Sequence, residues 1–210
     1  GDLSDWRGHA GAPIRLGAPG QSLSPWGTWE GPEDASARVW TAWDGAWFYL
    51  AAEVVDDVIA DAVTGHEIYK SDGIEVYFDA DLFGDLESRQ HSDDDSQYGA
   101  FLQQGSSAVF AWSRLNDYSP GGRIADNRAV TAEQTISGEP CAYVIEAAIP
   151  LEEIRLTPRD GLVIGFNCGL TDDDDPSRVH PFGQDIQMMW SRRRLSWQNP
   201  QSFAQLRLVE

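Results

Sequence analysis

The clearest alternation of apolar and polar residues falls in the stretch Ile-Glu-Val-Tyr-Phe-Asp at positions 74–79. Because successive side chains of a strand point to opposite faces, this pattern predicts a strand with one core face and one displayed face. The displayed residues would be Glu75, Tyr77 and Asp79, with Tyr69 just upstream. A carboxylate and a phenol beside an aromatic edge form a hydrogen-bonding surface of the kind that suits a sugar.

Short alternating segments recur along the rest of the chain. Asp44-Gly45, between segments 37–43 and 47–54, predicts a hairpin. Further strands are predicted at 100–103, 108–114, 129–136, 141–149, 163–170, 187–190 and 205–209. About ten short strands, with neither a long helix nor an internal repeat, predict an all-β antiparallel sandwich of immunoglobulin-like or jelly-roll-like type in two sheets. The length of 210 residues fits a single domain spanning residues 1–210.

The amino-acid composition excludes some classes of binding partner. The chain has 15 lysines and arginines against 34 aspartates and glutamates, a net charge of -19, which would repel nucleic acid and anionic membranes. No apolar run is long enough to span a bilayer. Nine tryptophans exceed what a core of this size needs, so we expect some to be exposed. The start at Gly1, without a signal-peptide pattern, indicates a mature or excised piece of a longer secreted protein, expected to be monomeric.

Two acidic clusters are candidate cation sites. Residues 93–95 are three consecutive aspartates inside the acidic stretch 81–97, and residues 172–175 are four more at the end of a predicted strand. Carboxylates of this kind either face solvent or bind calcium. The candidate ligands are Asp93, Asp95, Asp172 and Asp174, with Asp56 and Asp57 as further candidates. The four histidines lack the spacing of a zinc site.

The two cysteines leave an alternative open. Cys141 and Cys168 lie in alternating stretches that we interpret as antiparallel neighbours joined through 150–161. A disulfide and two buried free thiols explain this pattern equally well.

Several motifs together resemble carbohydrate-binding module family 9 and its DOMON-like relatives. The resemblance covers most of the chain from Val39 to Leu208, and its order and spacing matter more than any one motif. The matching segments are Asp5-Trp6, Trp47-Phe-Tyr-Leu, Asp56-Asp57, Ser71-Asp72-Gly-Ile-Glu75-Val-Tyr-Phe-Asp79, Tyr143-Val-Ile-Glu-Ala-Ala-Ile-Pro150, Ile164-Gly-Phe-Asn, and Ser196-Trp197-Gln-Asn-Pro200 with Phe203 and Leu206-Arg-Leu208.

The resemblance implies a β-sandwich with structural calcium that holds a sugar between two aromatic residues. The two aromatic positions fall on Tyr69, where the family usually has tryptophan, and on Trp197; the glutamate that binds sugar hydroxyls falls on Glu75. A family arginine falls near Gly99, and a family asparagine falls near Arg194. The full set of expected sugar-binding residues is Tyr69, Glu75, Tyr77, Gln97, Trp112, Arg194 and Trp197.

The leading hypothesis is therefore a non-catalytic module that binds an extracellular polysaccharide or a glycan chain end and targets a linked catalytic domain. One alternative is a glycoside-active enzyme that pairs Glu75 with Asp79 or with an aspartate of the acidic stretch. A second alternative is a haem-binding electron-transfer domain, in which Met188 or Met189 and a histidine are the axial ligands.

Overall fold

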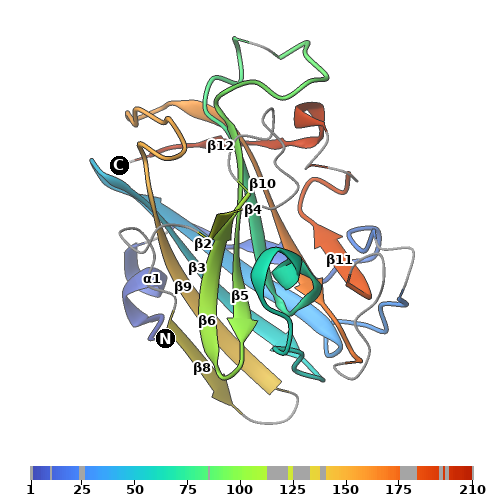
Figure 1. Cartoon of the computed structure of the whole chain (residues 1–210). Helices are drawn as coiled ribbons and strands as arrows, with labels where there is room; N and C mark the ends of the chain where they lie inside the picture. The colour runs from blue at the N-terminus through green and yellow to red at the C-terminus, as the bar shows by residue number, and fades with distance from the viewer. Residues whose placement is uncertain are drawn as a thin grey trace.

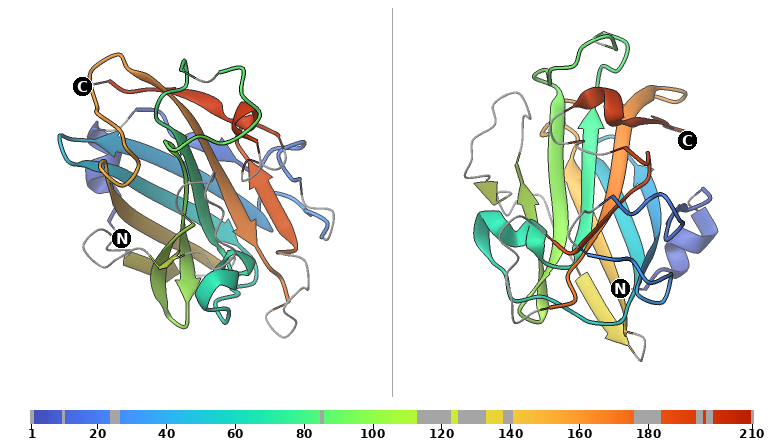
Figure 2. Two further views of the ribbon diagram at one scale, coloured as in Figure 1. Left: turned by 45° about the horizontal axis from the view of Figure 1, so that its top comes forward. Right: turned by 90° about the vertical axis from the view of Figure 1, so that its right-hand side faces the viewer.

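The computed structural model describes residues 2–9, 11–23, 27–84, 86–112, 123–124, 133–137, 141–175, 184–193, 196 and 199–209. Within these ranges twelve strands form two antiparallel sheets that lie face to face (Figures 1 and 2). The predicted all-β sandwich is confirmed.

The first sheet has five strands in the order β1-β2-β3-β9-β8. Their bounds are β1 Ile14–Leu16, β2 Ala35–Trp43, β3 Trp47–Asp56, β9 Cys141–Pro150 and β8 Glu133–Ser137. A short helix, α1 (Ser4–His9), covers the outer face of this sheet, where Leu3 and Trp6 pack against Trp40 and Ala51. The indole of Trp6 donates a hydrogen bond to Glu146 of β9 at 2.8 Å.

The second sheet has seven strands. Six follow the order β11-β10-β4-β5-β6-β7, and β12 pairs with β10. Their bounds are β11 Ile186–Met189, β10 Val163–Asp172, β4 Gly73–Asp79, β5 Asp95–Gln103, β6 Ser106–Ala111, β7 Arg123–Ile124 and β12 Ala204–Arg207. Two 3₁₀ helices, η1 (Gly65–Lys70) and η3 (Pro200–Ser202), precede β4 and β12. The connection between β4 and β5 projects from one end of the sandwich (Figure 1).

Aromatic rings fill the space between the sheets. Phe78 of β4 meets Phe48 of β3 edge to face, with ring centroids 4.9 Å apart, and lies 5.4 Å from the ring of Phe166 in β10. All three rings are fully buried, and edge-to-face pairs add attraction beyond the area they bury. The core face predicted for 74–79 is confirmed, because Ile74, Val76 and Phe78 all point into this layer.

The cysteine stretches are not neighbours in one sheet. β9 belongs to the five-stranded sheet and β10 to the seven-stranded sheet, so the hairpin that we expected between them is wrong. The chain crosses from one layer to the other through 151–162, which alternation within each strand does not encode. Cys168 is a buried free thiol, and burial raises its pKa; the side chain of Cys141 lies outside the described residues.

The hairpin at Asp44-Gly45 is confirmed: β2 and β3 pair along their length, from Ala35 opposite Asp56 to Trp43 opposite Phe48. The carboxylate of Asp44 accepts hydrogen bonds from the backbone N–H groups of Ala46 and Trp47 at 2.7 and 2.8 Å. β5 begins earlier than predicted, because the run of aspartates ends in the strand rather than in the preceding loop.

Substitution of Phe78 by alanine tests the core. Its ring contacts both sheets, so Phe78→Ala should lower the free energy of unfolding by about 3–5 kcal/mol, measured by urea denaturation. Phe83, which is 66 % exposed on the β4–β5 connection, is the matched control. Phe83→Ala should change the free energy by less than about 0.5 kcal/mol; equal effects of the two substitutions would contradict the packing described.

Candidate functional site

The polar face of β4 is covered, not displayed. Glu75 is 3 % exposed, Tyr77 1 % and Gln97 7 %, so the expectation of an open sheet face is corrected. Leu23, Met189 and Phe203 pack over Tyr77, and the Tyr77 and Phe203 ring centroids are 5.9 Å apart. These covering residues come from distant parts of the chain, and periodicity within β4 carries no information about them.

The register of β10, β4 and β5 places the site residues in two adjacent rows that run across these three strands. Tyr77 lies between Asn167 of β10 and Gln97 of β5, and Glu75 lies between Gly169 and Gly99. Neither glycine can be replaced easily. A Cβ at Gly99 would lie 2.1 Å from the ring of Phe101, and one at Gly169 would lie 2.5 Å from the sulfur of Met189. The two glycines thus leave room for side chains that enclose Glu75 from both sides.

Glu75 is the centre of a hydrogen-bond network. Its carboxylate accepts from the Tyr77 hydroxyl at 2.9 Å, from Gln97 Nε2 at 3.2 Å and from Gln187 Nε2 at 3.0 Å. Gln97 Nε2 also donates to the Tyr77 oxygen at 3.2 Å. These groups come from three strands, β4, β5 and β11, so the sheet itself fixes their geometry.

Burial dominates the electrostatics of this network. It raises the pKa of Glu75 to about 7, against the lowering effect of the three hydrogen bonds. It also raises the pKa of Tyr77, with the nearby Glu75 carboxylate as a second cause. A carboxylate with a pKa near neutrality changes its charge readily when a ligand adds or removes a hydrogen bond.

An aromatic cluster borders the network. The backbone N–H of Trp112 donates to the Gln97 carbonyl at 3.0 Å, which places Trp112 beside Gln97. Its ring lies 4.7 Å from that of Phe110 and 6.3 Å from that of Tyr69, measured between centroids. Tyr69 and Trp112, predicted from positions far apart in the sequence, therefore lie together.

Asn167 connects the sheet to the segment that carries the second predicted aromatic residue. Its side-chain amide donates to Ser191 Oγ and Ser196 Oγ, both at 2.9 Å. Ser202 Oγ donates in turn to Ser196 Oγ at 2.8 Å. Ser196, which directly precedes Trp197, is thus held next to the strand position opposite Tyr77. Trp197 and Arg194 themselves lie outside the described residues.

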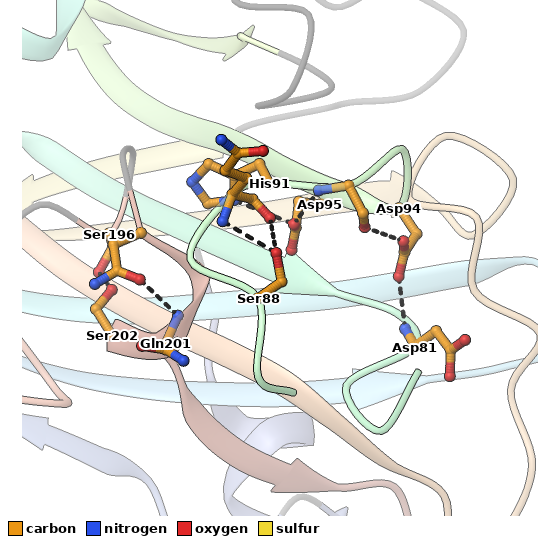
Figure 3. Close-up of polar contacts among 11 residues, drawn as sticks. Asp81, Ser88, His91, Asp94, Asp95, Ser196, Gln201 and Ser202 are labelled. Carbon is orange, nitrogen blue, oxygen red and sulfur yellow. Dashed lines mark hydrogen bonds and ion pairs between the residues drawn. The ribbon is translucent and has the colours of Figure 1, made fainter. Parts of the chain in front are cut away.

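The first acidic cluster makes contacts of its own (Figure 3). Asp95 accepts from the backbone N–H of Ser92 at 2.7 Å and lies 3.1 Å from His91 Nδ1. Asp94 accepts from the backbone N–H of Asp81 at 2.7 Å, closing the neck of the β4–β5 connection. Asp93 is exposed and lies 3.6 Å from Arg155. The structure does not bring Asp93 and Asp95 together with Asp172 and Asp174.

Two other groups of aspartates do converge. Within each group, one carboxylate oxygen from each aspartate lies within 4.8 Å of those of the other two. The buried group is Asp56, Asp72 and Asp172, at the end of β3, just before β4 and at the end of β10. The second group, Asp34, Asp57 and Asp174, is more exposed.

The buried group fits a hard cation. Both side-chain oxygens of Asp172 are buried without a hydrogen-bond partner among the described residues. Asp72 is held by the backbone N–H groups of Ala60 and Asp173. Burial raises the pKa of Asp172 to about 10 and that of Asp56 to about 7, so these acids are poorly compensated by the protein alone. Three converging carboxylates are the oxygen donors that calcium prefers.

Comparison with protein-family models matches residues 21–210 to a family described as carbohydrate family 9 binding domain-like. The chain belongs to this family. The resemblance drawn from its motifs is confirmed. The module is therefore a non-catalytic carbohydrate-binding domain.

The curated relatives are much longer enzymes, and the module matches only a short region of each. It is 28% identical over 180 residues to endo-1,4-beta-xylanase A of Thermotoga maritima, and 27% identical over 144 residues to endo-1,4-beta-xylanase C of Paenibacillus barcinonensis. These matches cover 85% and 68% of the module but only 14% and 11% of the xylanases.

Solved structures share the fold at low identity. Two are of a family 9 carbohydrate-binding module from Caldicellulosiruptor kristjanssonii, one in complex with glucose and one with cellotriose. They match with TM-scores of 0.67 and 0.69 at 20% and 19% identity. The glucose complex covers 99% of this chain and 88% of its own, and the cellotriose complex covers 100% and 87%.

Sequence reasoning missed several residues of both sites. Gln187 and Asn167 were predicted within strands, but their partners were not, because register between distant strands is not visible in one sequence. Asp72 stood inside a recognised motif without a role. Its signal was positional for one pair: Asp72 directly precedes β4 and Asp172 ends its antiparallel neighbour β10, so pairing brings these two together. Asp56 ends β3 in the other sheet, and its approach depends on how the two layers pack.

The raised pKa of Glu75 predicts a pH dependence of stability. Because burial raises the pKa of Glu75 in the folded protein from its ordinary value of 4.5 to about 7, its contribution to stability is full below pH 4.5 and is lost as pH rises through 7. The difference in unfolding free energy between wild type and Glu75→Gln should therefore fall by about 3 kcal/mol from pH 4 to pH 8. The other buried acids are common to both proteins and cancel. A difference that stays constant with pH would contradict this environment for Glu75.

Proposed function

We propose that the module binds a β-1,4-linked polysaccharide, with one sugar unit seated at Glu75, Tyr77, Gln97 and Gln187. The observation that carries the proposal is the buried network on Glu75, bordered by Tyr69 and Trp112. A pyranose needs fixed partners for its hydroxyl rim and an apolar surface for its C–H face. Glu75 offers an acceptor, and the two glutamine amides and the Tyr77 hydroxyl can exchange their bonds to Glu75 for bonds to the sugar.

Trp197 supplies the second aromatic surface in this proposal. Its neighbour Ser196 accepts a hydrogen bond from Asn167, the strand partner of Tyr77. Arg194, in the same segment, has a planar guanidinium that suits a pair of adjacent hydroxyls. Glucose and cellotriose in the similar modules, and the 1,4-linked xylan named in the related enzymes, support glucose or xylose oligomers as the ligand class.

The module acts, we propose, by tethering. Its relatives are short parts of xylanases, which supports linkage to a catalytic domain in a secreted enzyme. Tethering raises the local concentration of the enzyme at its substrate even when each contact is weak. No helix within the described ranges has the length and hydropathy needed to cross a bilayer.

Calorimetry with glucose and xylose oligomers of one to six units tests the proposal. Wild type should bind at least one series, and Trp197→Ala and Glu75→Gln should each weaken binding by about tenfold or more, because each removes one face of the sugar's environment. Trp6→Ala is the matched control, since Trp6 lies on the outer face of the opposite sheet; it should bind as wild type. Full binding by both site variants would overturn the proposed site, and no binding of any oligomer would overturn the ligand class.

Calcium is the second part of the proposal. Asp56, Asp72 and Asp172 would hold the ion. Its two positive charges would offset two of the three carboxylate charges and link the ends of β3 and β10 to the start of β4. A hard cation bound by carboxylates contributes its binding free energy to folding. The role is structural, because these residues lie at strand ends and not in the rows around Glu75.

Calcium should raise the melting temperature of the module by about 5–10 °C when it is present at a hundredfold excess over its Kd, and a chelator should reverse the shift. Asp172→Asn should abolish the shift while leaving a folded protein, since it also removes an uncompensated charge. Asp93→Asn should keep it, because Asp93 is exposed beside Arg155. Differential scanning calorimetry decides; the reverse pattern of the two variants would move the site to the 93–95 cluster.

A further inference from the structure

A groove of about 260 Å³ is lined in part by Phe203 and by Asp79, which ends β4 two residues after Tyr77. One wall is the β4–β5 connection, with Leu82 and Leu86, and the other is the segment before β12, with Pro200 and Phe203. Figure 3 shows Ser88 on the first wall and Gln201 on the second. None of the interactions assigned so far, to sugar or to calcium, uses this space.

Phe203 is shared between the groove and the sugar site. Its ring packs against Tyr77, with centroids 5.9 Å apart, and also lines the groove. The centroid of its ring also lies 6.0 Å from that of the His91 ring. A ligand that extends beyond the Glu75 rows in this direction along the sheet therefore meets the groove next.

Both walls are held in place by hydrogen bonds. Gln201 Nε2 donates to the Glu87 carbonyl at 3.3 Å, which joins one wall to the other. Arg193 Nη1 donates to the Gln201 carbonyl at 2.7 Å, and Asp94 closes the base of the β4–β5 connection. A groove braced in this way exists before any ligand arrives, so binding costs little ordering of the chain.

The lining combines apolar side chains with polar ones, and the buried Asp79 is among the polar ones. Leu82, Pro200 and Phe203 form apolar surface, and Glu87, Arg193 and Gln205 contribute groups of both charges and a neutral amide around it. Such a surface suits the C–H face and hydroxyl rim of a neutral sugar ring. The volume is slightly below that of pockets for drug-sized ligands, which suits a single ring and not a long peptide.

We propose that this groove is a second saccharide subsite, which binds another unit of the glycan chain held at Glu75. The inference rests on the proposed function. It assigns a length preference to the module: an oligomer that reaches the groove should bind more tightly than a monosaccharide, because the two contacts share one loss of translational freedom.

Ser88→Trp, which fills the groove, and Gln205→Ala, which removes a rim amide from an exposed strand position, test the proposal. In calorimetry with the wild-type ligand series of one to six units, Ser88→Trp should leave monosaccharide affinity within about twofold and lower the affinity of the longest oligomer by about fivefold or more. Gln205→Ala should act in the same direction with a smaller effect. Phe83→Ala, on the same connection but outside the groove lining, should bind every oligomer as wild type.

Unchanged monosaccharide affinity shows that the variants fold and that the first site works. If Ser88→Trp then gains affinity with oligomer length as wild type does, the second subsite is overturned and the proposed function stands. If wild type binds no member of the series, the proposed function fails and the inference with it.

In the bound wild type, NMR shifts of the Leu86 methyl groups and the Gln205 side-chain amide should change only with oligomers of two units or more; changes with the monosaccharide alone would also contradict the assignment.

Discussion

A carboxylate removed from water has to be compensated by hydrogen bonds, by a cation or by protonation, and this sandwich buries several around one strand. β4 is covered on both faces, yet only one of its faces is apolar. Asp72 immediately before the strand and Glu75 within it are both buried. The carboxylates of Asp72 and Glu75 are compensated in different ways, and this difference gives the module its two candidate sites.

Glu75 is compensated by side chains that a sugar can replace. Tyr77, Gln97 and Gln187 donate to it from three strands. The Tyr77 hydroxyl and the two glutamine amides can each form a hydrogen bond to a sugar hydroxyl group instead. Asp72 is compensated by backbone N–H groups, while its neighbour Asp172 has no hydrogen-bond partner among the described residues, so this cluster calls for positive charge. Recognition of the ligand is thus assigned to the middle of β4, and cation binding to the strand ends where Asp56, Asp72 and Asp172 converge.

Much of the fold was predictable because alternation and turn chemistry are local. The hairpin at Asp44-Gly45 and the inward face of 74–79 required only neighbouring residues. The pairing register of the strands, the sheet to which each strand belongs and the residues that cover β4 were not predictable, because they depend on contacts between distant segments. Cys141 and Cys168 lie in different sheets, and Phe203 covers Tyr77. For the site, the resemblance selected Glu75 and Tyr69, whose roles stay predictions, and the structure places Tyr69 beside Trp112 and Glu75 beside Tyr77. Gln187 needed the pairing of β11 with β10.

The central claim is that the buried carboxylate of Glu75 receives sugar hydroxyl groups, and its own resonance reports this most directly. The ¹³C shift of the Glu75 carboxyl, followed by NMR from pH 5 to pH 9 with and without saturating oligosaccharide, measures its pKa in both states. Because sugar hydroxyl groups exchange with the donors Tyr77, Gln97 and Gln187 around the carboxylate, its pKa should shift from about 7 on binding. A Glu75 resonance that titrates identically with and without bound sugar would contradict the account.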